Sequence, residues 1–240
     1  NHVLQGDAIK TAIEAHRRDM PYCMGTLFWQ HNDCWPVASW ASRDYYGRWK
    51  AQHYFARKVY RDILVSPITD EGEVLNIQVV SDRLKSCNGT LQVEVMKLTG
   101  EKVNSYKRNI KIDANSSQTV FSVPLGEALK NTPKEDVFVH AVLLTDKGKN
   151  SYANNYFLVK HPKAAITSSI EPIEGGFELT LNSNNFARAV FITIGDVDSS
   201  FSDNYFDILP GGSVKVNVYT DLPQPAFKKQ LKVISLSDEY

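Results

Sequence analysis

A short run rich in indole and amide side chains offers the clearest chemistry in this sequence. It is Trp29-Gln30-His31-Asn32-Asp33-Cys34-Trp35-Pro36. An indole face can cover the C–H face of a pyranose, while amide and carboxylate groups can hydrogen-bond its hydroxyls. The run therefore indicates a sugar contact. The alternative is structural, with Trp29 and Trp35 packed in a core and with Asn32 and Asp33 capping a turn before the proline.

To position this run, the chain needs a strand before it and helices on either side. Residues 1–64 predict the order helix, strand, helix, in which Asp7 caps the first helix. Residues 22–29 are mostly apolar without alternation, as in a strand covered on both faces. A second helix is expected from Tyr46 or Gly47. The order is typical of a piece of an α/β fold, and one strand cannot form a sheet alone.

The two helices are each expected to bury one face. In the first helix, side chains at spacings of three and four share a face: Ile9, Ala12, Ile13 and His16. In the second helix, the expected buried stripe is Trp49, His53, Ala56, Tyr60 and Ile63. Arg17 and Arg18 suit the last turn of the first helix and are expected to be solvated charges there.

The pattern changes to a period of two in the rest of the chain. Between 65 and 162, about seven short alternating runs are separated by turn signals, which is typical of an immunoglobulin-like sandwich. A smaller unit of the same style follows at 163–240, where Phe177, Leu179 and Leu181 alternate with polar neighbours. The linker between the two sandwiches is expected near 161–163. The predicted fold is therefore mainly β, with two sandwiches after an α-β-α segment.

Composition excludes several classes of partner and cofactor. Lys+Arg and Asp+Glu each number 27 in 240 residues, so no net field favours nucleic acid or a membrane surface. We expect no membrane span, no signal peptide, no metal site and no cofactor. Of the three cysteines, Cys23 and Cys34 could form a disulfide, but packed, reduced thiols are favoured over it.

Residues 22–37 carry a resemblance to a known family. Together with Ser39-Trp40 and Asp44-Tyr45-Tyr46-Gly47-Arg48-Trp49-Lys50, they resemble the last barrel strand and last barrel helix of β-mannosidases in glycoside hydrolase family 2. The shared pattern is Trp-Gln, a variable residue, Asn-Asp, and then Trp-Pro. Residues 202–211 resemble the terminal sandwich of the same family more loosely.

The resemblance implies a five-domain retaining glycosidase that hydrolyses terminal β-mannosyl residues. Residues 1–64 would be the C-terminal end of its (β/α)8 catalytic barrel. It implies that Trp29 lines the floor of the subsite for the cleaved mannose. Asp33, Trp35 and Asn32 would shape the loop at the strand end, with Gln30 in support. An internal cap by Asp33 is the alternative for that residue, and Trp40 and Trp49 are expected to be core residues.

The same resemblance implies that catalysis needs groups outside this chain. A retaining mechanism uses two carboxylates about 5–5.5 Å apart, and in this family both are glutamates on earlier barrel strands. The one glutamate before residue 70 is Glu14, which we expect to be exposed on the first helix. We therefore predict no catalytic residue here and no hydrolysis by this chain alone.

Other functions remain open at this point. The sandwiches could form a carbohydrate-binding module or a purely structural buttress, and the candidates for an exposed aromatic row are Tyr152, Tyr156, Tyr205, Phe206 and Tyr219. A β-galactosidase or β-glucuronidase type of enzyme is the alternative substrate class. The expected partner is a β-mannoside, with a homo-oligomer possible. The expected location is periplasmic or secreted in a bacterium and lysosomal in an animal.

Overall fold

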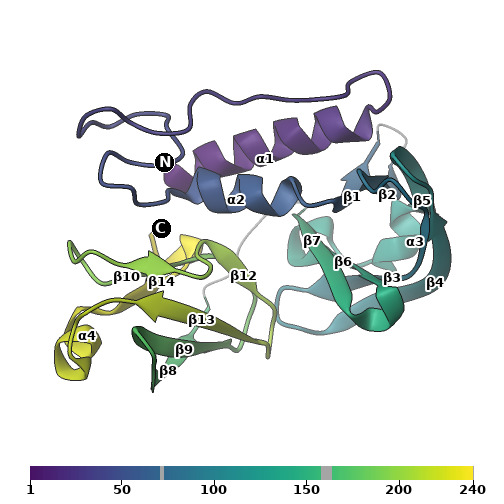
Figure 1. Ribbon diagram of the computed structural model, residues 1–240. Helices are drawn as coiled ribbons and strands as arrows, with labels where there is room; N and C mark the ends of the chain where they lie inside the picture. Colours follow the sequence, from purple (N-terminus) through teal and green to yellow (C-terminus); the bar gives the residue numbers. More distant parts are fainter. Residues whose placement is uncertain (71–72, 158–163, 240) are drawn as a thin grey trace. The chain divides into compact units, whose positions relative to one another are not determined.

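A computed structural model describes residues 1–70, 73–157 and 164–239 (Figure 1). The chain divides into two compact units. Unit 1 comprises Asn1–Asp7, Phe28–Phe55 and His161–Tyr240, and unit 2 comprises Ala8–Leu27 and Ala56–Lys160. Each unit contains one antiparallel β-sandwich, which confirms the predicted mainly β class. The expected linker at 161–163 lies outside the described residues.

The sandwich of unit 2 has a three-stranded and a four-stranded sheet (Figure 1). The first sheet has the order β1-β2-β5, made of Ile63–Thr69, Val74–Ser81 and Ser116–Pro124. The second has the order β4-β3-β6-β7, made of Lys102–Ile112, Cys87–Lys97, Val137–Thr145 and Asn150–Phe157. A short helix, α3 (Leu125–Leu129), follows β5.

The period of two explains why these strands pack as they do. Leu75, Ile77 and Val79 on β2, and Leu91, Val93 and Val95 on β3, are all 0–1% exposed and belong to one core. Their polar neighbours face the other side, because successive side chains of a strand point to opposite faces. The alternation in the sequence therefore identifies the buried face of both sheets.

The sandwich of unit 1 is smaller and also combines four strands with three. Its sheets have the orders β11-β13-β9-β8 and β12-β10-β14. The strands of the first are Ser200–Phe201, Ser213–Tyr219, Gly176–Ser183 and Ile166–Ile173. Those of the second are Phe206–Ile208, Ala187–Thr193 and Lys232–Ile234. Helix α4 (Gln224–Gln230) adds Phe227, which is fully buried, to the core that contains Leu179 and Leu181.

Helix α1 (His2–Arg18) differs from its prediction in its start and its buried face. It begins at His2, so Asp7 lies inside the helix and pairs with Arg188 instead of capping the first turn. Ile13 is buried as expected, but Ala12 and His16 are exposed. Polar residues take their place on the buried face, so apolar spacing alone could not identify it.

Glu14 is buried, contrary to the prediction of an exposed carboxylate, and is 7% exposed. Within unit 2 it accepts hydrogen bonds from Asn154 at 2.8 Å and from Ser66 at 3.1 Å, and it pairs with Lys10 at 3.3 Å. The side-chain amide of Asn154 on β7 and the hydroxyl of Ser66 on β1 are the hydrogen-bond partners that a buried carboxylate needs.

Arg17 is also buried, at 8% exposed, and the prediction of a solvated charge was wrong for it. Its guanidinium donates to the carbonyl oxygen of Val59, to that of Arg61 at 2.9 Å, and to the Asp82 carboxylate at 2.8 Å. Together with Glu14, it fixes the C-terminal half of α1 on the sandwich of unit 2 through charged hydrogen bonds.

The strand predicted at 22–29 does not form. This segment has no strand or helix, and Tyr22, Leu27 and Trp29 are 92%, 99% and 77% exposed. A strand buried on both faces needs paired strands on either side. No described strand pairs with this segment, and the side chains of His16 and Tyr60 form hydrogen bonds with it at Thr26. The α-β-α order is therefore reduced to two helices joined by a long irregular segment.

Helix α2 (Ala51–Val59) begins later than Tyr46 or Gly47. Gly47 has a φ of 86°, which helical backbone excludes, and it lies in a turn instead. Ala56 and Ile63 are buried as predicted, although Ile63 lies in β1. The buried face of the helix itself is made of Ala51, Gln52, Tyr54, Ala56 and Val59.

The core of unit 2 offers a direct test of this packing. Leu91→Ala should lower the free energy of unfolding by about 2–5 kcal/mol, because it removes a fully buried side chain and leaves a cavity. Leu84→Ala, at a side chain that is 90% exposed, is the matched control and should change stability by about 0.5 kcal/mol or less. Urea unfolding followed by circular dichroism measures both. Equal effects of the two substitutions would contradict the assigned core.

Candidate functional site

The predicted sugar-contact run lies in a loop of unit 1 that folds back on itself. Asp33 N–H donates to Arg43 O at 3.1 Å, Arg43 N–H donates to His31 O at 2.9 Å, and Ser42 N–H donates to Gln30 O at 2.9 Å. The returning segment is held in turn, because Lys50 N–H donates to Ser42 O at 2.9 Å. These bonds give residues 30–50 a fixed path without regular secondary structure.

Asp33 is the buried centre of this loop, at 5% exposed. Its carboxylate accepts a short hydrogen bond from Ser39 Oγ and pairs with Lys50 Nζ at 3.1 Å. The hydrogen bond from Ser39 and the charge of Lys50 lower the pKa of Asp33, and burial opposes them. Asp33 therefore acts as an internal brace, as its structural alternative proposed.

The two tryptophans of the run are exposed instead of packed. Trp29 is 77% exposed and Trp35 is 64% exposed, so the core-packing alternative does not describe them here. The amide of Gln30 donates to Asn32 O at 2.8 Å, and the amide of Asn32 donates to Asp33 O at 3.1 Å. The loop thus presents two indoles to solvent, while the polar side chains of the run shape its backbone.

Two further tryptophans were predicted to be core residues, and the structure corrects both. Trp40 is 61% exposed and Trp49 is 38% exposed. Trp49 contacts Tyr54 on α2, with ring centroids 5.3 Å apart, so it is only partly covered. Cys34 is exposed rather than packed, and Cys23 and Cys34 are both free thiols. Residues 22–29 form no strand before the loop, so no covered sheet is present there to bury these side chains.

Two partners of Asp33 were missed by reasoning from the sequence. Ser39 and Lys50 lie 6 and 17 residues further along the chain. Both fall inside the stretches that carry the family resemblance, which was the available signal. Nothing in their spacing from Asp33 indicated that a single carboxylate would gather them.

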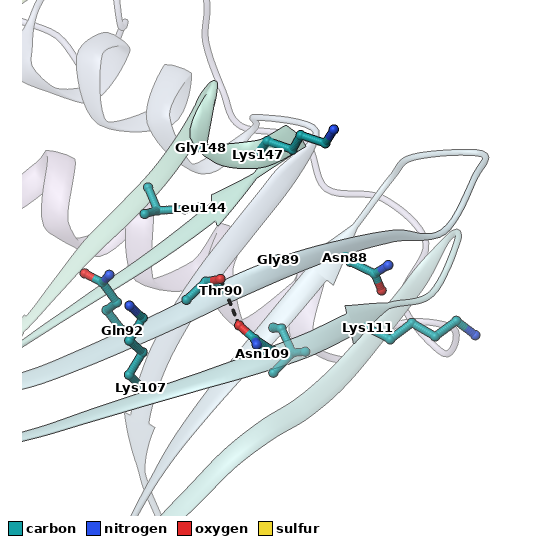
Figure 2. A pocket seen from close by; sticks show the side chains of 11 residues that line it. Asn88, Gly89, Thr90, Gln92, Lys107, Asn109, Lys111, Leu144, Lys147 and Gly148 are labelled. Carbon is teal, nitrogen blue, oxygen red and sulfur yellow. Dashed lines mark hydrogen bonds between the residues drawn. The ribbon is translucent and has the colours of Figure 1, made fainter.

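A hollow on the sandwich of unit 2 shows what that surface offers. It measures about 650 Å³, and none of its lining residues is aromatic. Figure 2 shows Thr90 on β3 hydrogen-bonded to Asn109 on β4, at 3.0 Å, with Lys107 and Lys111 projecting from β4. This polar surface has no ring on which a sugar could stack.

The five candidates for the aromatic row of a carbohydrate-binding module, the alternative function, do not form such a row on the surface. Tyr152, Tyr205 and Phe206 are 4–9% exposed, and Tyr156 is only partly exposed and packs against the core of unit 2. Tyr219, at 44%, is the one exposed candidate. A single ring does not form a row, because the other four rings help to build the two units.

Metal and membrane features are absent from the part of the chain that the structure describes. Among residues 1–70, 73–157 and 164–239, no group of three or more His, Cys, Asp and Glu side chains is placed to hold a metal ion. In the same ranges, no helix is both long and apolar enough to span a bilayer.

Comparison with known proteins places the fold and the loop in a family. Residues 73–163 match a family model described as a mannosidase Ig/CBM-like domain, and residues 160–239 match a mannosidase model described as an Ig-fold domain. The chain is 32% identical to the β-mannosidase of Mus musculus over 263 residues, which cover 99% of this chain and 29% of that protein. It is 27% identical to β-mannosidase A of Aspergillus terreus, covering 87% and 25% respectively.

A solved structure agrees with these matches. The β-D-mannosidase of Dictyoglomus thermophilum superposes with a TM-score of 0.82 and 27% identity, covering 98% of this chain and 29% of that one. The chain belongs to the β-mannosidase family. It corresponds to the C-terminal part, about 30%, of family 2 β-mannosidases, as the resemblance implied. An exo-chitosanase of Amycolatopsis orientalis, with a TM-score of 0.69 and 15% identity, shares the fold.

The chain therefore spans less than a third of the length of these β-mannosidases. Its two sandwiches are the Ig-like domains of the family. The loop from Phe28 to Lys50 precedes them in the chain and belongs to unit 1.

The brace at Asp33 gives a prediction that depends on pH. Asp33→Asn should destabilise unit 1 near neutral pH, because Lys50 loses its carboxylate. The pKa of Asp33 is lower in the folded state, so its contribution is present above the unfolded pKa of about 4 and is lost as pH falls through the folded pKa. The difference between wild type and variant should therefore shrink on acidification.

Tryptophan fluorescence during urea unfolding measures this effect, since all four tryptophans lie between residues 29 and 49. Glu101→Gln removes one charge from the exposed Lys97–Glu101 pair and is the charge-matched control. It should have almost no effect at any pH. A stability difference for Asp33→Asn that grows as pH falls would rule out the brace.

Proposed function

We propose that this chain is the C-terminal portion of a retaining β-mannosidase-like enzyme that hydrolyses terminal β-mannosyl residues. Trp29 would form one wall of the subsite for the cleaved mannose, and Trp35 would line the same loop. The observation that carries this proposal is the exposure of both indoles on a loop whose path is fixed by a buried carboxylate. A rigid aromatic surface that is held open suits the apolar face of a pyranose.

The proposal assigns the catalytic carboxylates to a part of the enzyme outside this chain. Glu14 is not a candidate for either role, because its oxygens are engaged by Asn154, Ser66 and Lys10 inside unit 2. A nucleophile or acid/base must reach the anomeric carbon or the leaving oxygen. A carboxylate that is 7% exposed and fully occupied by structural partners cannot do so.

The first test concerns the chain alone. The purified 240-residue chain should release no nitrophenol from p-nitrophenyl β-mannoside above the uncatalysed rate, because the proposal places both catalytic glutamates outside this chain and Glu14 is engaged by structural partners. If the chain hydrolyses the substrate above background and Trp29→Ala abolishes that activity, the catalytic groups lie within this chain and the proposal is wrong.

The second test concerns the complete enzyme. There, Trp29→Ala should lower kcat/KM for aryl β-mannosides roughly tenfold or more, since it removes a stacking surface in the mannose subsite. Trp40→Ala is the matched control, because Trp40 is 61% exposed on the same loop but has no assigned sugar contact. Equal losses in the two variants would indicate a general effect of the loop and would refute the role of Trp29.

A further inference from the structure

Unit 1 contains a second pocket whose walls mix aromatic rings with charged side chains. It measures about 590 Å³, within the range of roughly 300–1,000 Å³ that is usual for small-ligand sites. All of its lining residues belong to unit 1. We call it the aromatic pocket and define it by Arg43, Trp49, Lys50, Tyr54, Phe191 and Tyr205.

Four rings in contact with one another form its apolar wall. Trp49 meets Tyr54 at a centroid distance of 5.3 Å, Tyr54 meets Tyr205 at 6.1 Å, and Tyr205 stacks on Phe191 at 4.8 Å. Because each ring is held by the next, the wall is preorganised. Trp49 remains 38% exposed and offers the largest aromatic surface of the four to a ligand.

Tyr205 adds a polar group to this wall. The residue is 9% exposed, and its hydroxyl, which forms no hydrogen bond with a described residue, is accessible to solvent. Burial raises the pKa of Tyr205, so the hydroxyl stays protonated at neutral pH and can donate. A ligand oxygen in the pocket can accept a hydrogen bond from this hydroxyl in place of water.

The charges around the pocket favour an anionic group on the ligand. Lys50 is paired with Asp33, and Arg48 is paired with Asp44 at 2.6 Å. Arg43 donates from Nε to Gly47 O at 2.9 Å, and its remaining guanidinium nitrogens have no carboxylate partner among the described residues. A guanidinium matches the planar geometry of a carboxylate better than that of any neutral group.

We propose that the aromatic pocket binds a sugar that carries a carboxylate. The pyranose ring lies against Trp49, the carboxylate pairs with Arg43, and the hydroxyl of Tyr205 donates to a ring substituent. The pocket is a binding site and performs no chemistry. It is separate from the mannose subsite proposed at Trp29, which is not among its lining residues.

Calorimetric titration of the 240-residue chain tests this assignment with two probes. Methyl β-D-glucuronide and methyl β-D-glucoside differ only at C6, which is a carboxylate in the first and a hydroxymethyl group in the second, and the glucuronide should bind about tenfold more tightly or better. Tyr205→Phe keeps the ring and removes the hydroxyl, and it should weaken glucuronide binding about fivefold. Arg43→Gln should remove the preference for the glucuronide.

Matched controls separate the site from general attraction. Tyr219→Phe removes the hydroxyl of an exposed tyrosine on β13, and Lys107→Gln removes an exposed cation from unit 2, so both should leave the affinity unchanged. Trp40→Ala should also leave it unchanged, because Trp40 is exposed on the same loop and does not line the pocket. Should Arg43→Gln fail to fold, Tyr205→Phe still decides the question.

Three outcomes would overturn the proposal. They are no heat from either glycoside, equal affinity for the two glycosides, and a glucuronide affinity that Tyr205→Phe leaves unchanged. Binding of the glucuronide that both pocket variants weaken, and that the controls do not, supports it.

Discussion

One buried ion pair determines the shape of the region that carries the family's sugar-contact motif. The Asp33 carboxylate joins Ser39 and Lys50, while the backbone of residues 30–33 bonds to residues 42–43. The loop itself contains no helix or strand, and polar contacts hold it, including those of Gln5 on α1 with Trp40 O and of His53 on α2 with Ser42 Oγ. Burying a charge is costly unless its partners are well placed, and such contacts therefore specify one geometry.

A second set of charged contacts serves unit 2 in a similar way. Glu14 and Arg17 lie on one face of α1 and meet β1, β7 and the carbonyl oxygens after α2. Removing one partner of such a pair leaves the other charge buried and unpaired. The two sandwiches themselves follow a different rule, since their cores are apolar and their strands alternate. Charges thus position the helix and the loop, and apolar packing builds the domains.

This difference explains what could be predicted from the sequence. The strands of both sandwiches were visible because Leu75, Ile77 and Leu91 recur with a period of two, and burial follows that period directly. The buried face of α1 could not be predicted from the sequence, because it includes a glutamate and an arginine, which are rarely buried unless paired. Apart from neighbours on α1 such as Lys10, their partners lie 42 to 140 residues away, and local spacing carries no information on such pairs.

The motif itself was found, but its local structure was not. Residues 22–29 have the composition of a strand buried on both faces, and such a segment forms only when neighbouring strands are present. An internal cap by Asp33 is the alternative that the sequence offers for this residue, and the contact with Lys50 agrees with it. The role of Trp29 and Trp35 as sugar contacts stays a prediction. Both indoles are exposed and therefore accessible to a sugar.

The exposed rings of the loop also have a consequence for the behaviour of the chain in concentrated solution. Trp29, Trp35 and Trp40 are each more than 60% exposed, and the chain has a formal net charge of zero at pH 7. Electrostatic repulsion between molecules is then weakest near neutral pH, so it does not oppose association through the exposed indoles. Self-association should therefore be greatest near neutral pH and should decline as the solution is moved to either side of it.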